Sequence, residues 1–160
     1  MILGLGVNLR PTREHDLELL TGWFARPDVN RYWGGVPLSI EEVAAKYIGR
    51  RRPMVECFIV EVDDTPAGLI QYHVDGERHG GIDLVLLEEQ RRRGVGRAAV
   101  NAIVGYLINE LQWSEVTVDP AEWNEDGTRF WAAVGFAPVR AVHDDPDRES
   151  HTLMRWARER

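Results

Sequence analysis

The sequence predicts an α/β domain, and three observations lead to this fold class. Short runs rich in Val, Ile, Phe and Tyr alternate with stretches that carry apolar residues at helical spacing. Glycine and proline are scattered as turn markers, with no repeat or long linker. The length of 160 residues, with 44% apolar and 28% charged, suits one domain, 1–160. We expect about seven strands and four helices in the order β-α-α-β-β-β-α-β-α-β-β.

The first third of the chain is predicted to form one strand and two helices. The strand covers Ile2 to Leu9 and ends at a proline turn. Thr12 and Glu14 precede the run HDLELLTGWF, a pattern typical of a capped helix of about three turns. Ser39 with Glu42 begins a second capped helix, SIEEVAAKYIGR. The loop between the two helices, ARPDVNRYWGGVP, is polar and aromatic, and we expect it to cover a core or to shape a site.

The middle of the chain changes to the period of strands. Three short apolar runs are separated by turn residues and predict an antiparallel meander over Cys57–Val62, Ala67–Val74 and Gly81–Leu87. From Gly94 onwards, apolar residues recur every three or four positions as far as Leu111. This spacing gives the wide apolar face of a long helix.

The last third of the chain is predicted to form a strand, a helix and two closing strands. The first strand is the β-branched run Ser114–Val118. The helix spans Asn124–Val134, with Asn124 as its N-cap and Gly135 as its C-terminal stop. The closing strands are Phe136–Val142 and Ser150–Trp156, joined by the turn residues HDDPDRE.

Composition and charge exclude several classes of protein. The net charge of -7 argues against a general nucleic-acid binder and favours cationic partners. Because no apolar stretch reaches about 18 residues and no basic segment precedes an apolar start, we expect no membrane span, no signal peptide and a cytoplasmic location. The lone Cys57 is expected to pack in a strand. The five histidines show no metal-ligand spacing, so we expect no metal.

The stretch EEQRRRGVGRAAV, residues 88–100, places arginines against glycines where a strand gives way to a helix. The amides from about Arg92 to Arg97 lack intrahelical partners there, and the helix dipole adds positive potential, so the turn suits an anion. Gly94 and Gly96, on either side of Val95, lack Cβ atoms, so a phosphate can approach. Charge-assisted bonds can come from the nearby arginines, Arg91, Arg92, Arg93 and Arg97. We expect a diphosphate ligand; the alternative is a solvated basic helix start.

Two motifs give the chain a family resemblance. Arg91-Arg92-Arg93-Gly94-Val95-Gly96 fits the pattern Q/R-x-x-G-x-G/A of the GNAT superfamily of N-acetyltransferases, and WAAVGF, 131–136, is similar to that family's Y-x-x-x-G-F close. The predicted order of elements resembles the GNAT fold over almost the whole chain. The resemblance implies a mixed, mostly antiparallel sheet, and an enzyme that uses acetyl-CoA and releases coenzyme A.

The family resemblance also implies residues that hold the coenzyme. The arginine-glycine turn then binds the pyrophosphate, and Asn124 lies where the family keeps an Asn for the pantetheine arm. Backbone groups near Leu86 and Leu87 are implied to hold pantetheine where the strand bulges from its neighbour. Trp131 stands where family members commonly carry a Tyr general acid, and indole cannot supply that proton. Trp131 therefore either shapes the sulfur end of the coenzyme site or belongs to the core.

A narrower resemblance concerns the acceptor. The segments Gly81-Ile82-Asp83, Val118-Asp119-Pro120 and Tyr32-Trp33-Gly34 resemble the G-I-D, T-D-P and W-W-G segments of aminoglycoside 6'-N-acetyltransferases. The implied substrate is a primary amine of a small cationic molecule. We expect the enzyme to be a monomer or a homodimer. Siderophore-type acyltransferases, which modify a lysine-derived amine, have a similar layout. A coenzyme-A-binding module without turnover is a further alternative, because Trp131 replaces the usual acid.

Two carboxylates are the candidate catalytic residues. Asp83 is the first candidate for the base, because an amine with a pKa near 10 must lose a proton before it attacks. Asp119 ends the next strand and is expected across the cleft, where both carboxylates attract a cation and orient its amine. The alternatives are a solvent-facing strand residue for Asp83 and a turn residue for Asp119. Tyr32 and Trp33 either stack on a sugar-like substrate or cap the core.

Overall fold

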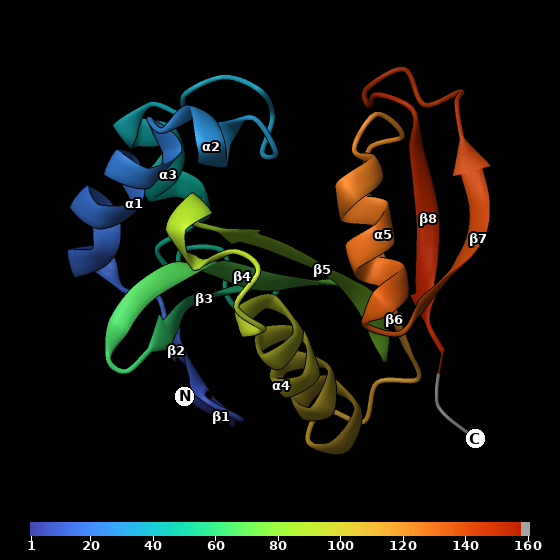
Figure 1. The fold of residues 1–160 in the computed structure, drawn as a ribbon, viewed down its shortest axis with the longest axis horizontal. Helices are drawn as coiled ribbons and strands as arrows, with labels where there is room; N and C mark the ends of the chain where they lie inside the picture. The colour runs from blue at the N-terminus through green and yellow to red at the C-terminus, as the bar shows by residue number, and fades with distance from the viewer. Residues whose placement is uncertain (158–160) are drawn as a thin grey trace.

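The computed structural model describes residues 1–157 of the chain. Within these residues an eight-stranded sheet has the spatial order β1-β2-β3-β4-β5-β6-β8-β7 (Figure 1). The paired strands are antiparallel except β5 and β6, which are parallel. The strands are β1 Ile2–Gly4, β2 Val7–Pro11, β3 Val55–Val62, β4 Thr65–Gly76, β5 His79–Leu86, β6 Glu115–Val118, β7 Phe136–Val142 and β8 His151–Trp156.

Helices cover both faces of this sheet. The α-helices are α1 Leu17–Phe24, α2 Pro27–Asn30, α3 Ile40–Lys46, α4 Val95–Asn109 and α5 Glu125–Ala133, and two 3-10 turns are η1 Glu14–Asp16 and η2 Glu88–Gln90. Alternate residues of β3 point to different cores: Phe58 and Val60 pack with α4, whereas Cys57 and Ile59 pack with α1 and α3. The sheet is therefore buried on both sides at β3, as the nearly continuous apolar run of this strand requires.

The predicted mixed, mostly antiparallel sheet and its central meander are confirmed, whereas the prediction for the first third of the chain is corrected. The run Ile2 to Leu9 forms a hairpin of two strands, β1 and β2, because Gly6 adopts a φ of +77° that allows a tight turn. This hairpin accounts for eight strands in place of about seven. The short helix α2, which begins at Pro27, was also not predicted.

The start of the first helix differs from the prediction in its capping residue. The Thr12 hydroxyl is buried and has no hydrogen-bond partner within the described part of the chain. Instead, the Asp16 carboxylate accepts the Arg13 amide at 2.8 Å and two bonds from Arg10 at 2.9 and 3.0 Å. Burial raises the pKa of Asp16, but these bonds outweigh it and the net pKa is lowered.

The other predicted caps are confirmed. The Ser39 hydroxyl accepts the Glu42 amide at 3.1 Å, and the Glu42 carboxylate accepts the Ser39 amide at 3.4 Å, which completes a capping box. The Asn124 side-chain oxygen accepts the Gly127 amide at 2.9 Å and caps α5. That helix stops before Gly135, whose φ of +114° only glycine adopts readily.

The sheet opens between β5 and β6. Parallel pairing joins only His79–Gly81 to Glu115–Thr117. Beyond Gly81, β5 continues to Leu86 and keeps its pairing with β4 alone. The two strands therefore diverge, and in Figure 1 the part of the sheet formed by β6, β8 and β7, with α5, stands apart from the part beside α2. This opening positions the candidate site.

Candidate active site

The turn before α4 leaves free amides facing open space. Gly94 is the N-cap, with a left-handed φ of +78°. Ala98 is the first residue of the helix whose amide bonds back, to the Gly94 carbonyl at 3.1 Å, so the amides of Val95 to Arg97 lack intrahelical partners. A Cβ placed on Gly94 would meet no atom within 4 Å. An anion can therefore reach this helix start, which the protein's own side chains do not fill at Gly94.

The Cα of Gly96 faces the neighbouring helix α5, and the coenzyme role expected for Gly96 stays a prediction. A Cβ on Gly96 would lie 3.0 Å from the Phe130 ring and 3.5 Å from a methyl carbon of Leu86. The missing side chain therefore allows α4 to pack closely against α5. Val95, between the two glycines, is buried in the core. Gly94 alone keeps an open approach to the turn.

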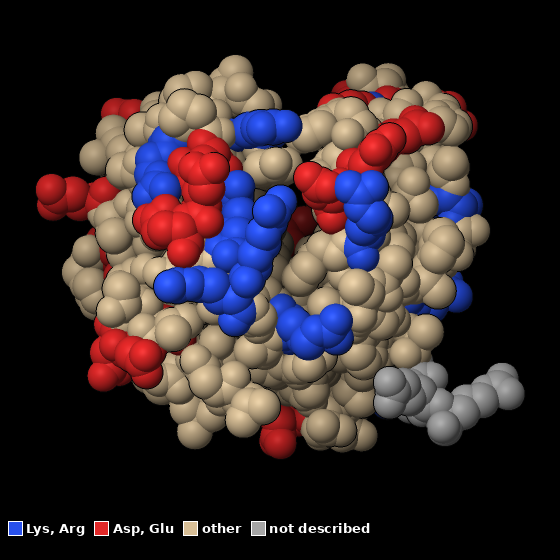
Figure 2. All heavy atoms as spheres, in the orientation of Figure 1, with Lys and Arg blue, Asp and Glu red and all other residues tan. Residues whose placement is uncertain are grey.

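The arginines of this turn divide into two that are engaged and two that face solvent. Arg91 donates to the Leu86 carbonyl at 2.9 and 3.1 Å and to the Asp28 carbonyl at 2.6 Å. Arg97 donates to the Ala133 carbonyl at the end of α5, at 3.2 Å. Arg92 and Arg93 are exposed. Figure 2 shows basic side chains gathered over this region, beside a hollow that separates it from the α5 side.

The backbone amides of Leu86 and Leu87, both expected to hold pantetheine, point in opposite directions. The Leu87 amide donates to the Ala67 carbonyl on the β4 side at 2.9 Å and is therefore used. Since successive residues of a strand alternate in direction, the Leu86 amide points away from β4, as does its carbonyl, which accepts Arg91. Of these two residues, only Leu86 thus presents its amide toward the opening.

Asp83 lies two residues beyond the last pair between β5 and β6, at the inner end of the opening. Its side chain is 33% exposed and accepts the Gln71 amide at 3.0 Å. Gln71 is buried and is held in turn by Cys57, whose sulfur lies 3.3 Å from the Gln71 side-chain oxygen. Burial raises the pKa of Cys57 to about 12, so the group stays a thiol that can donate to this oxygen. The chain Cys57–Gln71–Asp83 fixes the carboxylate.

His73 is a neighbour of Asp83 that the sequence analysis assigned to the surface or to packing. Its Nδ1 lies 3.7 Å from Asp83 Oδ2, and its Nε2 lies 3.4 Å from Asp75 Oδ2. The interaction with Asp83 is the largest cause of a raised pKa at His73, although burial opposes it. Opposite His73 in the sheet is Gly81, where a Cβ would lie 2.5 Å from the imidazole. Because this placement depends on the register of β4 on β5, no local signal in the sequence marks it.

Asp119 follows the end of β6, on the other side of the opening from Asp83. Its charge contributes to the raised pKa of His73, so the two carboxylates act on the same group. Arg148, from the connection between β7 and β8, donates to Asp119 Oδ2 at 2.8 Å. Arg148 was not predicted from the sequence, because no local pattern marks this pairing of residues 29 positions apart.

Tyr32 and Trp33 are adjacent in the chain but lie in different surroundings. Trp33 packs against Phe24 and donates its indole N–H to the Tyr47 hydroxyl at 2.7 Å, so it borders the core beneath α1 and α3. Tyr32 stacks on Trp123, with ring centroids 6.0 Å apart. This pair joins the turn that follows α2 to the segment that precedes α5. A pocket of about 170 Å³ lies beside it, lined by Arg31, Tyr32, Trp123, Asn124, Glu125, Asp126 and Arg129.

Trp131 is a core aromatic residue in this structure. It is 8% exposed and packs edge-to-face on Phe130 at 5.0 Å and on Phe136 at 5.3 Å. The Asn124 side-chain oxygen, as described above, is committed to the cap of α5. These contacts explain the positions of Trp131 and Asn124 without a ligand. The coenzyme-binding roles expected for the two residues therefore stay predictions.

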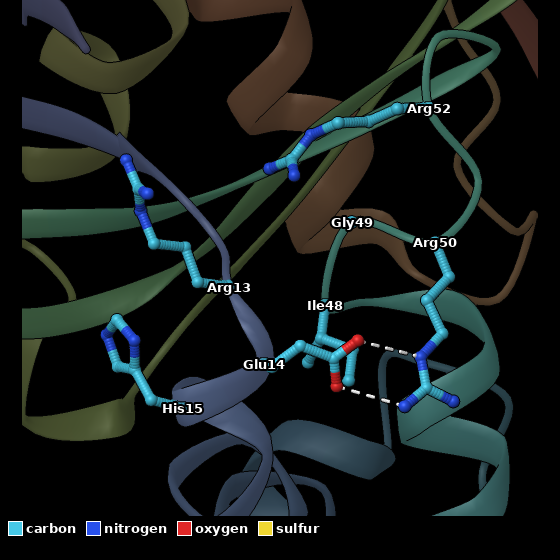
Figure 3. A pocket seen from close by; sticks show the side chains of 7 residues that line it. All are labelled: Arg13, Glu14, His15, Ile48, Gly49, Arg50 and Arg52. Atoms are coloured by element: carbon cyan, nitrogen blue, oxygen red, sulfur yellow. Dashed lines mark hydrogen bonds and ion pairs between the residues drawn. The ribbon is translucent and has the colours of Figure 1, made fainter.

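A second hollow lies away from this opening. It has a volume of about 480 Å³ and is lined by Arg13, Glu14, His15, Ile48, Gly49, Arg50 and Arg52. Figure 3 shows Glu14 facing Arg50, with which it forms two hydrogen bonds of 2.9 and 3.0 Å. Among residues 1–157, no group of three or more His, Cys, Asp or Glu is placed to hold a metal ion. No helix in the same range is long and apolar enough to cross a membrane.

Comparison with known proteins agrees with the geometry of this site. A family model described as an acetyltransferase (GNAT) domain matches residues 7–137. An aminoglycoside N(6')-acetyltransferase type 1 from Klebsiella pneumoniae is 28% identical over 147 residues, which cover 81% of this chain and 73% of that enzyme. An enzyme of the same name from Serratia marcescens matches with the same values.

Solved structures share the fold over nearly the whole chain. AAC(6')-Ib with ribostamycin and coenzyme A has a TM-score of 0.86 and 26% identity, covering 96% of this chain and 94% of that one. Other complexes of that enzyme contain acetyl-CoA, or kanamycin with coenzyme A. A spermidine N-acetyltransferase from Vibrio cholerae, at 17% identity and a TM-score of 0.78 over 94% of this chain and 93% of its own, shares the fold. The predicted GNAT fold is confirmed, and the chain belongs to the GNAT acetyltransferase family.

Proposed function

We propose that this enzyme transfers the acetyl group of acetyl-CoA to a primary amine of a small cationic substrate, with the 6'-amine of an aminoglycoside as the leading acceptor. The observation that carries this proposal is the opening between β5 and β6. It sets an anion-accepting turn at Gly94 and two carboxylates, Asp83 and Asp119, around one space. The relatives and the bound molecules described above support the same acceptor class.

The residues at the start of α4 fit a diphosphate. The amides of Val95 to Arg97 are free, the approach at Gly94 is open, and Arg92 and Arg93 are exposed beside it. The helix dipole adds to this positive potential. The Leu86 amide, on the open flank of β5, is then the group that orients the pantetheine arm or the thioester carbonyl. Acetyl-CoA supplies the acetyl group as a thioester when bound.

Asp83 and Asp119 bind the acceptor amine and prepare it for reaction. An alkylamine with a pKa near 10 arrives protonated, and Asp83 accepts the proton that must leave before the nitrogen attacks. The nitrogen then forms the amide bond as the carbon–sulfur bond breaks. The thiolate leaves with little help because a thiol has a pKa near 8.5, and the remaining extra proton of the nitrogen passes to it, which gives the amide and the free thiol of coenzyme A. Asp119 attracts and orients the cation. Gln71 keeps the Asp83 carboxylate in position through its 3.0 Å bond.

The test is a thiol-release assay with acetyl-CoA against aminoglycosides, polyamines and lysine-like amines. We expect release with aminoglycosides, and a strong loss of kcat/KM in Asp83→Asn. Activity confined to polyamines or lysine-like amines would overturn the aminoglycoside assignment. Calorimetric binding of coenzyme A without thiol release for any amine would identify a binding module, and the absence of coenzyme binding would overturn the proposal as a whole.

A further inference from the structure

Arg148 forms an ion pair with Asp119, the carboxylate that the proposed function assigns to binding the acceptor. Its Nη1 lies 2.8 Å from Asp119 Oδ2, and the two side chains are 46% and 29% exposed. The bond to Asp119 is the main cause of a raised pKa at Arg148, and the charges of Asp83 and Asp145 add to it. The guanidinium therefore lies in the field of both candidate catalytic carboxylates, at a position suited to a substrate ammonium.

The backbone beside Arg148 is held in place independently of this ion pair. Glu149 accepts the Trp123 indole N–H at 2.8 Å, and the Glu122 amide donates to the Ser150 carbonyl at 2.9 Å. Two residues further on, the Thr152 amide donates to the Pro120 carbonyl at 3.1 Å. Because the chain is fixed on the C-terminal side of Arg148, its half-exposed side chain can leave Asp119 without displacing the connection between β7 and β8.

We propose that Arg148 is an internal counterion of Asp119 that competes with a second ammonium group of the acceptor and so determines specificity among amines. This inference rests on the proposed function. A molecule with several amines places one at Asp83 for reaction and a second at Asp119, where it must displace the guanidinium. A monoamine engages Asp83 alone and leaves the Arg148–Asp119 pair intact. Arg148 thus weakens the binding of multiply charged acceptors relative to singly charged ones.

The experiment compares kanamycin, which carries several amines, with glucosamine, which carries one. In Arg148→Ala we expect KM for kanamycin to fall about two- to five-fold, the range that a partly exposed ion pair supports, with kcat unchanged. KM for glucosamine should stay the same. Arg148→Lys keeps the charge and should retain a KM close to that of the native enzyme. A common change of KM for both amines, or no change for kanamycin, would overturn the inference.

A matched control and a binding measurement separate this inference from the proposed function. Arg155 forms a 2.9 Å ion pair with Glu115 at a similar exposure of 50% and 36%, on β8 and β6. Arg155→Ala should therefore change KM for neither amine, and its melting temperature shows what loss of such a pair does to stability. Kanamycin binding by calorimetry, without acetyl-CoA, should tighten in Arg148→Ala. Equal binding in native and variant refutes the role of Arg148, whereas tightened binding without any turnover refutes only the acetyl-transfer function.

Discussion

Replacing Gly94 by alanine tests the turn at the start of α4, and Gly6 provides a matched control. Both glycines have left-handed backbones, with φ of +78° and +77°, and at both a Cβ would meet no atom within 4 Å. An alanine in this conformation costs about 1–2 kcal/mol, and nothing steric adds to it. Each variant should lose this much free energy of unfolding. For a domain of this size, each kcal/mol lowers the melting temperature by roughly 2–4 °C.

The two variants should differ in their affinity for coenzyme A. The Cβ at Gly94 projects into the space through which a phosphate would approach the free amides, whereas Gly6 lies in the β1–β2 turn. Loss of one hydrogen bond to a charged group corresponds to about 1.5–3 kcal/mol. We therefore expect coenzyme A to bind Gly94→Ala at least about ten-fold more weakly, and Gly6→Ala as tightly as the native protein.

Isothermal titration with coenzyme A, run beside thermal denaturation of the same samples, gives both quantities. Equal coenzyme affinity in Gly94→Ala and Gly6→Ala would refute the assignment of the turn, because backbone strain is the same in both. If both variants lost affinity for coenzyme A, the cause would be their lower stability and not a blocked approach of the phosphate.

Three further predictions concern the surroundings of the site. Asp83→Asn removes the main cause of the raised pKa of His73, so the midpoint of His73 in an NMR titration should fall; an unmoved midpoint would show that the pair does not form. In urea unfolding, this pair stabilises the native protein fully below the unfolded pKa of about 6.5 and is lost as pH rises through the raised folded value, so the stability advantage over Asp83→Asn should shrink as the pH rises above about 6.5. Arg91→Ala breaks the bonds to the Leu86 and Asp28 carbonyls and should lower the free energy of unfolding by about 1.5–3 kcal/mol. Arg93 is exposed, so Arg93→Ala should leave the free energy of unfolding nearly unchanged. Equal losses in the two variants would show that the hydrogen bonds of Arg91 do not stabilise the fold.

The features that the sequence predicted correctly depend on local signals. The capping box at Ser39 and the cap at Asn124 involve residues three positions apart, so the pattern in the chain contains the whole interaction. The meander is equally local, because its strands follow one another through short turns. The glycine turn before α4 is placed by the same reasoning, with a helix beginning just after Gly94.

The features that were missed depend on contacts between distant segments. Asp16 accepts the Arg13 amide at the start of the 3-10 turn η1, and Arg10, on the neighbouring strand β2, holds its carboxylate there, whereas Thr12 gave the stronger local signal. His73 meets Asp83 only through the register of β4 on β5. Arg148 reaches Asp119 only because β8 inserts between β6 and β7, an order that the chain does not follow. No local pattern contains these pairings.

The flank of β5 beyond Gly81 is an internal sheet edge, which most proteins cover because a bare edge attracts foreign strands. Here the edge is recessed between two halves of one molecule, so another polypeptide has little access while a slender ligand with amide groups can dock along it as an added strand does. Recognition of such a ligand then depends on the spacing of the main-chain groups, which substitutions at positions 82–86 leave intact. Side chains elsewhere around the opening can then differ between acceptors without changing how the donor binds to this edge.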